Sequence, residues 1–250
     1  MRVTYIKHSG FLAEWADIAC LFDWAEGELP EIDPARRLFI FVSHVHADHF
    51  TPAIFERCAR FPKRTFILSS DIPVDPAREK GENVIRMGPD RRRVLTGGSA
   101  GALSAATLGS TDCGVAFVVS YAGKTVYHAG DLHWWAWPDD TPAEERAMKN
   151  DYFAQLVKLK GMRLDAAFVP LDPRLGANYT LGFDALMRSV HVNMAFPMHM
   201  WDRYEYIEKF CGMPVAAAYS DRIARIEHPL QSFELDAPDV TADPVPADGE

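Results

Sequence analysis

The sequence predicts one mixed domain of the α/β or α+β class. The chain has 250 residues, enough for a single sizeable domain. Hydrophobic residues make up 48% and charged residues 24%, as in ordinary globular proteins. Strand-like segments outnumber helical ones and are interleaved with them. Periodicity alone does not choose between the two classes.

Ten segments have the apolar or alternating pattern of β-strands. They are residues 3–8, 18–23, 39–43, 65–69, 104–107, 115–121, 125–128, 166–169, 194–196 and 223–227. Helical patterns cover 51–60, 143–159 and 183–191, the first opened by Thr51-Pro52 as cap and first helical residue. In the helix at 143–159 the apolar side chains of Ala147, Phe153, Leu156 and Val157 are expected to face a sheet.

Residues 1–233 are therefore expected to form the domain, and 234–250 a disordered acidic tail. The tail contains Pro238, Pro244 and Pro246 and no Lys or Arg.

The composition disfavours several classes of partner. The formal net charge of −9 disfavours broad nucleic-acid binding, and the basic run Arg91-Arg92-Arg93 is interpreted as a solvated loop or edge strand. No apolar run reaches the length of a membrane span, and the N-terminus lacks a signal-peptide core. Four widely spaced cysteines indicate reduced thiols and a cytoplasmic protein. A homo-oligomer is compatible with the sequence.

The strongest chemical signal is the run His44-Val45-His46-Ala47-Asp48-His49, which follows the apolar segment 38–42. Imidazole and carboxylate groups are ligands for transition metals. If the strand continues, His44 and His46 project to the same side and bind one ion. Asp48 and His49 follow a turn and can reach a second ion, and two adjacent ions suit hydrolysis.

This run resembles the His-x-His-x-Asp-His signature of the metallo-β-lactamase superfamily. Gly130-Asp131 after the segment 124–128 and His199 after 195–198 are similar to the later motifs of that superfamily. The resemblance implies a four-layer αββα sandwich and a metal site made by His44, His46, Asp48, His49, Asp131 and His199. The opening Tyr5-Ile6-Lys7-His8-Ser9-Gly10-Phe11 is most similar to the ascorbate-lactonase-like branch.

One superfamily ligand, a histidine between the first motif and the bridging Asp131, has no counterpart here. Asp112 is the best substitute, and Cys113 is a poorer one. Because carboxylate is a harder ligand than imidazole, the substitution would favour manganese or iron at the first site or weaken it. We expect one well-defined site, made by Asp48, His49, Asp131 and His199, and one of uncertain occupancy. The cofactor is one or two divalent ions, with zinc preferred and manganese or iron as alternatives.

Other residues near these motifs have two readings each. His8 and His128 are interpreted as buried hydrogen-bonding or supporting residues, not ligands. His133 contacts substrate or reinforces the first site, or else packs among tryptophans. Trp134, in the run Trp134-Trp135-Ala136-Trp137, walls a substrate pocket, or else packs against the helix at 143–159 or a second subunit.

Three more candidates follow the strand at 166–169. Asp172 and Arg174 form a structural ion pair, or Arg174 holds a substrate anion. Tyr179 is a candidate at the pocket rim. With Asp172 and Arg174 it completes the predicted substrate-binding set.

The predicted function is metal-assisted hydrolysis of a small molecule, with Asp48 orienting the water as the catalytic residue. A lactone, ester or phosphodiester is the preferred substrate class, which rests on the branch resemblance. The alternatives are an iron-dependent redox enzyme of the same fold and a non-catalytic metal- or ligand-binding protein.

Overall fold

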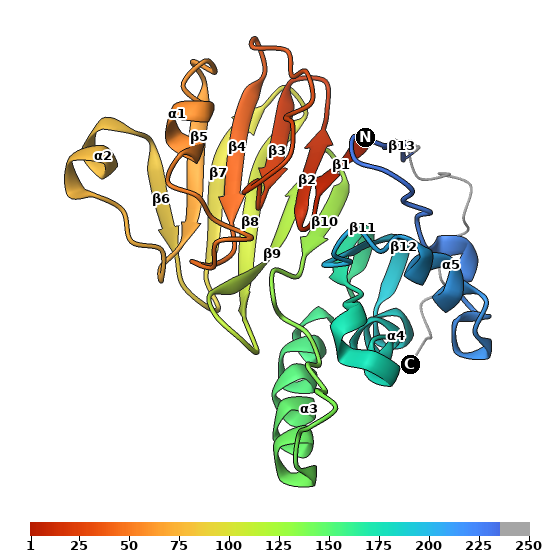
Figure 1. Ribbon diagram of the computed structural model, residues 1–250. Helices are drawn as coiled ribbons and strands as arrows, with labels where there is room; N and C mark the ends of the chain where they lie inside the picture. The colour runs from red at the N-terminus through yellow and green to blue at the C-terminus, as the bar shows by residue number, and fades with distance from the viewer. Residues whose placement is uncertain (236–250) are drawn as a thin grey trace, which may run out of the picture.

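Two β-sheets lie face to face in the computed structural model, which describes residues 1–235 (Figure 1). The first sheet has seven strands in the order β13-β1-β2-β3-β4-β5-β6, and the second has six in the order β12-β11-β10-β9-β8-β7. Helices lie outside the sheets. The predicted αββα sandwich is confirmed, with few and mostly short helices.

The seven-stranded sheet is antiparallel at one edge and parallel at the other. Its strands are β1 (Arg2–Lys7), β2 (Gly10–Glu14), β3 (Ile18–Phe22), β4 (Arg37–Val42), β5 (Arg64–Ser69), β6 (Val84–Met87) and β13 (Ser232–Glu234). The pairs from β13 to β3 are antiparallel, and those from β3 to β6 are parallel. β3 is fully buried, and β4 is buried apart from Arg37, as expected for strands covered on both faces.

The six-stranded sheet has the same mixed character. Its strands are β7 (Arg92–Gly98), β8 (Gly101–Gly109), β9 (Val115–Tyr121), β10 (Lys124–His128), β11 (Arg163–Pro170) and β12 (His191–Met198). β7 to β10 pair antiparallel, and β10 to β12 pair parallel. The parallel strands of both sheets therefore deliver their carboxyl ends to loops at one end of the sandwich.

Aromatic rings join the two sheets. Phe11 of β2 stacks on Phe168 of β11 with ring centroids 4.2 Å apart, and Phe41 of β4 meets Phe117 of β9 at 5.2 Å. Alternate residues such as Ile40 face the other way, into a second cluster with Ile54 and Phe55 of the short helix α1 (Ile54–Arg57). Because successive side chains along a strand point to opposite faces, each strand contributes to both layers of the core.

The longer helices accompany the six-stranded sheet. α3 (Pro142–Leu156) begins with a capping box between Thr141 and Glu144 and extends away from the strands in Figure 1. The other helical elements are α2 (Pro76–Gly81), α4 (Leu181–Ser189) and α5 (Glu205–Cys211), with 3-10 turns at Val157–Leu159, Pro173–Asn178, Pro214–Ala216 and Ser220–Arg222. Among the described residues, no helix combines the length and apolar character that crossing a bilayer requires.

Several predicted elements are wrong in extent. The helix predicted at 51–60 shortens to α1, and Ala53 rather than Thr51 precedes it. The segment 223–227 forms no strand; Ile223 makes only an isolated bridge with Ala195. In α3, Tyr152 and Leu156 are buried, whereas Phe153 and, just after the helix, Val157 are exposed.

Strands β2, β6 and β13 were not predicted, whereas Arg92 and Arg93 begin β7 at the edge of the six-stranded sheet, which was one of the two readings of the basic run. β2 follows β1 after the two-residue turn His8-Ser9, and the strand predicted at 3–8 wrongly included His8. The predicted tail begins two residues too early, because Glu234 pairs with Arg2 and Leu235 donates a backbone hydrogen bond to Met1. The remaining tail, 236–250, lies outside the described residues.

Candidate metal centre

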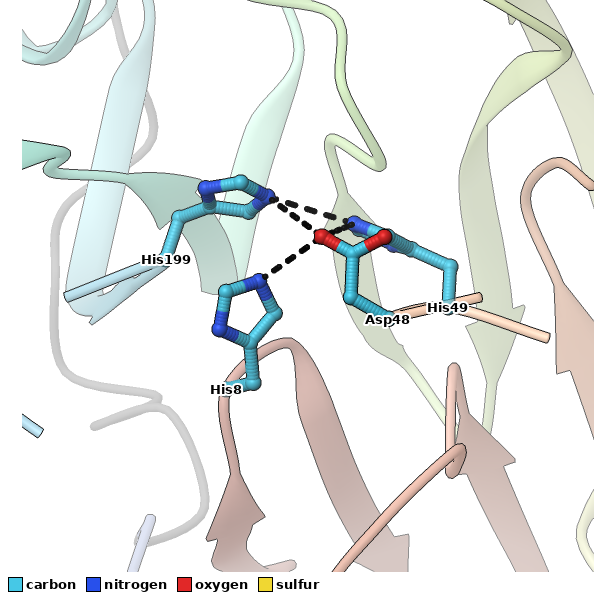
Figure 2. Close-up of side chains that lie close together, drawn as sticks. All are labelled: His8, Asp48, His49 and His199. Carbon is cyan, nitrogen blue, oxygen red and sulfur yellow. Dashed lines mark hydrogen bonds and ion pairs between the residues drawn. The ribbon is translucent and has the colours of Figure 1, made fainter. Parts of the chain in front are cut away.

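Histidine and aspartate side chains from distant segments converge where the parallel strands end. Two groups of possible ligands lie side by side: His8, Asp48, His49 and His199 form one, and His44, His46, Asp112 and Asp131 form the other. Within each group the ligand atoms all lie within 4.8 Å of one another. Figure 2 shows the first group, with the four side chains pointing toward one point. Every residue predicted as a metal ligand is in one of these groups.

A buried aspartate that the sequence did not reveal organises the loop after β4. Asp23, directly after β3, accepts hydrogen bonds from the Ser43 backbone N (2.7 Å), the Ser43 hydroxyl (2.6 Å) and His49 Nδ1 (2.7 Å). Burial would raise the pKa of Asp23, but the neighbouring histidines His128, His49 and His44 lower it overall. Because Asp23 holds a proton on His49 Nδ1, the other nitrogen, Nε2, is left to face the ligand group.

The first two histidines occupy different environments. His44 is buried, with Nδ1 2.9 Å from the Ser43 hydroxyl and Nε2 3.4 Å from Asp131 Oδ2. His46 is partly exposed, and its Nδ1 lies 3.4 Å from Asp112 Oδ2. Asp112 is therefore positioned beside the His44–His46 pair, where the sequence suggested a substitute for the missing histidine.

Asp131 lies between the two groups. Its Oδ1 is 3.1 Å from His49 Nε2 and 3.4 Å from His199 Nε2, while its Oδ2 faces His44. Burial would raise the pKa of Asp131, but His49, His44 and His199 hold it well below its usual value. The preceding Gly130 has a φ of +52°, and a Cβ there would come within 2.7 Å of Ser43 Cβ, so glycine lets the two loops meet.

His199 is fixed from behind by Asp172. The His199 Nδ1 donates to Asp172 Oδ2 at 2.8 Å, and the same fully buried carboxylate accepts from Arg174 and from the Trp201 indole. Asp172 was predicted to bind substrate. The structure instead makes it a supporting group for His199, joined to Arg174 in the ion pair that was the alternative reading.

His8 departs from its expected role, whereas His128 does not. His128 donates through Nε2 to the Ser9 carbonyl and accepts the Gly130 N–H at Nδ1, so both its nitrogens are bonded inside the protein. His8, in the turn between β1 and β2, points Nε2 at Asp48 Oδ2 over 3.3 Å (Figure 2). It therefore belongs to the ligand group itself.

The ligand groups form the floor of an open pocket of about 320 Å³. Asp48, Asp112 and Asp131 line it, and Trp135, Trp137 and Met148 supply an apolar wall. Among the described residues, Arg174 is the only Lys or Arg that lines this pocket. Its guanidinium lies 4.5 Å from the Trp201 ring and 5.5 Å from the Trp137 ring.

Besides Asp172, three residues predicted to bind substrate do not line the pocket. His133 is fully buried between Trp135 and Tyr152, and burial lowers its pKa to about 3. Trp134 packs against Phe153 and Lys149 of α3, which was the alternative reading of the tryptophan run. Tyr179 is buried beside Met213 instead of lying at the rim. The aromatic residues that line the pocket are Trp135 and Trp137, from the same predicted tryptophan run. Spacing alone could not show which rings of that run face the pocket.

Charged neighbours lower the pKa values of Asp48 and Asp131 and raise that of His49. Burial would raise the pKa of Asp48, but the nearby His8 imidazole and the charges of His49 and His199 lower it. Burial would lower the pKa of His49, yet Asp131 and Asp23 raise it to about 10. A cation that binds here must therefore displace a proton from His49.

Gly114 packs directly against the loop that carries His44. It has a φ of +68°, and a Cβ would come within 2.0 Å of the Ser43 carbonyl and 2.6 Å of His44 Cβ. Replacing it with alanine should cost about 3 kcal/mol, since left-handed strain and overpacking add. Urea unfolding measures this loss. Gly123→Ala is the matched control, because Gly123 has a φ of +73° and no atom of the described residues lies within 4 Å of the added Cβ. Equal losses in the two variants would show that the close contact does not matter.

Comparisons with known proteins agree with this geometry. A UPF0173 metal-dependent hydrolase from Heliobacterium modesticaldum is 29% identical over 228 residues, covering 84% of this chain and 86% of that relative. A second, from Opitutus terrae, is 29% identical over 215 residues, covering 80% of this chain and 84% of the relative. No family model matches the chain.

Solved structures share the fold at low sequence identity. Igni18, a metallo hydrolase from Ignicoccus hospitalis, superposes with a TM-score of 0.63 at 18% identity, covering 94% of this chain and 99% of that one. CmlA, a diiron β-hydroxylase from Streptomyces venezuelae, has a TM-score of 0.59 at 12% identity, covering 94% of this chain and 54% of that one.

Proposed function

We propose that this chain, a metallo-β-lactamase-like protein related to metal-dependent hydrolases, hydrolyses a small lactone, ester or phosphodiester by means of a metal-activated water. The observation that carries the proposal is the pair of adjacent ligand groups at the floor of an open pocket. His44, His46, Asp112 and Asp131 would hold one ion, and Asp48, His49 and His199 would hold the other, with Asp131 facing both. Zinc suits this donor set best, with manganese or iron as alternatives.

When bound, the metal supplies Lewis acidity and a water of lowered pKa. The chain itself must place that water and the electrophile. Asp48 is the candidate for orienting the water and accepting its proton, because its carboxylate is about one-third exposed and lines the pocket. Asp23 and Asp172 hold His49 and His199 in the tautomers that point Nε2 inward. The Trp135–Trp137 wall limits access of bulk water on one side.

Arg174 is the group best placed to bind a negative charge on the substrate. Its Nε and Nη2 are bonded to Asp172, and within the described residues its Nη1 donates no hydrogen bond. Nearly half of its side chain is exposed. An acidic or phosphoryl group on the substrate could therefore accept from Nη1 while an apolar portion lies against Trp137.

Replacing Arg174 with alanine should raise KM for an anionic substrate roughly 10- to 100-fold, the loss of a charged hydrogen bond. For a neutral ester with the same leaving group, KM should change less than threefold. Steady-state kinetics on the matched substrate pair measure the difference. The control variant is Arg188→Ala, which removes an exposed Arg paired with Asp184 on α4. Equal effects on both substrates would mean that Arg174 acts only through Asp172 and His199.

The proposal is tested by assaying protein stripped of metal and reloaded with zinc, manganese or ferrous iron. The panel contains a nitrophenyl ester, γ- and δ-lactones, and bis-nitrophenyl phosphate. We expect turnover of at least one class that depends on added metal. Full metal loading with no turnover of any class would contradict a hydrolase and support a binding protein.

An iron-dependent oxidation is the second candidate. The group that contains Asp112 offers two imidazoles and two carboxylates, a donor mixture that suits iron. CmlA, described as a diiron β-hydroxylase, has the same fold. Iron content and the visible absorption of protein purified aerobically separate the two candidates, because zinc protein is colourless.

The remaining properties fit a small-molecule enzyme. The pocket is the size of a small ligand, and the net charge of −9 supports the proposal that nucleic acid is not the substrate. The thiols of Cys20, Cys58, Cys113 and Cys211 are all unpaired, which supports a reducing, cytoplasmic location.

A further inference from the structure

We infer that His8 is a metal ligand, and that its imidazole makes the inner of two chemically unequal sites: a tight, nitrogen-rich inner site and a weak, carboxylate-rich outer site. The inner site is His8, Asp48, His49 and His199, and the outer site is His44, His46, Asp112 and Asp131. The inference rests on the proposed metal binding, but not on any catalytic activity.

The backbone holds His8 in a conformation that side chains rarely adopt. The two-residue turn between β1 and β2 is closed by the pairing of Lys7 with Gly10, and His8 has a φ of +52°. Glycine is the usual residue at such a position, since a Cβ is disfavoured there. An imidazole in place of glycine marks a side chain whose direction matters.

The ring of His8 is aimed into the ligand group and is otherwise unsatisfied. The side chain is 95% buried, and its Nε2 has no hydrogen-bond partner of good geometry within the described residues. That nitrogen lies 3.3 Å from Asp48 Oδ2, and the ring packs against His199 at 4.2 Å and Trp201 at 4.7 Å. A buried polar atom without a partner is costly, and a cation at this point would satisfy it.

The two donor sets differ in chemistry and in access to water. The inner site offers three imidazoles and one carboxylate, and its three histidines are buried. The outer site offers two imidazoles and two carboxylates, and the His46 and Asp112 side chains are 45% and 42% exposed. Three nitrogens and an oxygen in a dry setting suit zinc, whereas exposed carboxylates bind divalent ions more loosely.

The outer site has Asp112 where an imidazole was expected, and the inner site gains the imidazole of His8. Two consequences follow. The first equivalent of zinc should enter the inner site, and the outer site should exchange readily and accept manganese or ferrous iron.

The test is titration of metal-free protein with zinc by calorimetry, together with cobalt absorption spectra. Wild-type protein should show two binding events whose dissociation constants differ at least tenfold. His8→Asn removes the imidazole but suits a left-handed φ. It should weaken the tighter event by 100-fold or more and shift the visible cobalt bands, leaving the weaker event in place. Asp112→Asn should weaken the weaker event and leave the tighter event in place. His191→Asn, which removes a surface histidine from the start of β12, should change neither event.

Crystals of wild-type protein soaked in zinc provide a readout that does not depend on a variant folding. Anomalous scattering should place an ion about 2.0–2.1 Å from His8 Nε2. An unchanged tight event in His8→Asn, or an inner ion beyond ligand distance of His8, would overturn the inference. A protein that binds zinc as described yet hydrolyses nothing would refute the proposed function and leave this inference standing.

Discussion

Replacing Asp48 with asparagine should lower kcat at least 1000-fold while the protein keeps most of its metal. Proton transfer and orientation by a positioned carboxylate contribute factors of about 10² to 10⁴. Asparagine retains the size of the side chain and one carbonyl oxygen, but it cannot accept a proton. The three neighbouring histidines and Asp131 remain to hold an ion.

The experiment combines kcat on the most active substrate with elemental analysis of the same sample. Asp71→Asn is the control, since Asp71 is an exposed aspartate that contacts the same loop through the Val45 N–H but belongs to neither ligand group. We expect the control to retain turnover within a factor of about three. Unchanged turnover in Asp48→Asn would remove Asp48 from the catalytic role. Loss of metal together with turnover would make Asp48 a ligand first and leave the proton acceptor to be found.

Replacing Asp23 with alanine should produce the largest loss of stability. Its carboxylate is buried and accepts three hydrogen bonds, two from Ser43 and one from His49. Removing one partner of a buried charged network typically costs 3–5 kcal/mol, so we expect about 4 kcal/mol in the free energy of unfolding. Because His49 would lose its fixed tautomer, zinc affinity should fall roughly 10- to 100-fold as well.

Asp17→Ala is the matched control for Asp23. Asp17 accepts a comparable set of hydrogen bonds, from the Ser99 backbone and hydroxyl and from the Tyr121 hydroxyl, but in a half-exposed turn. Solvent can replace these bonds, so its loss should be about 1 kcal/mol and zinc affinity should not change. Urea unfolding and zinc titration measure both quantities. Similar losses in the two variants would show that burial is not what makes Asp23 important.

The sequence identified the candidate ligands that lie in contiguous motifs. His44, His46, Asp48 and His49 occur within six residues, and the motif order then led to Asp131 and His199. Asp112 was found by asking what stands where a histidine was expected. Each of these inferences needs only local chain geometry or a known motif order.

Residues that act through long-range contacts could not be found in this way. Asp23 looks like an ordinary residue at a strand end, and only the parallel pairing of β3 with β4 brings it to Ser43 and His49. The position of His8 depends on the turn between β1 and β2, which was missed because His8 was predicted to end a strand. Asp172 and Tyr179 were placed wrongly because spacing does not show whether a loop side chain faces the pocket or the core.

The ligands also come from both halves of the sandwich. His49 follows a strand of the seven-stranded sheet and His199 directly follows a strand of the six-stranded sheet, 150 residues later, yet their Nε2 atoms are 3.3 Å apart. An ion bound by both histidines would cross-link two segments that are far apart in the sequence, as disulfides do in secreted proteins. A chelator would then lower the stability of the contact between the two sheets as well as abolish the activity of the pocket.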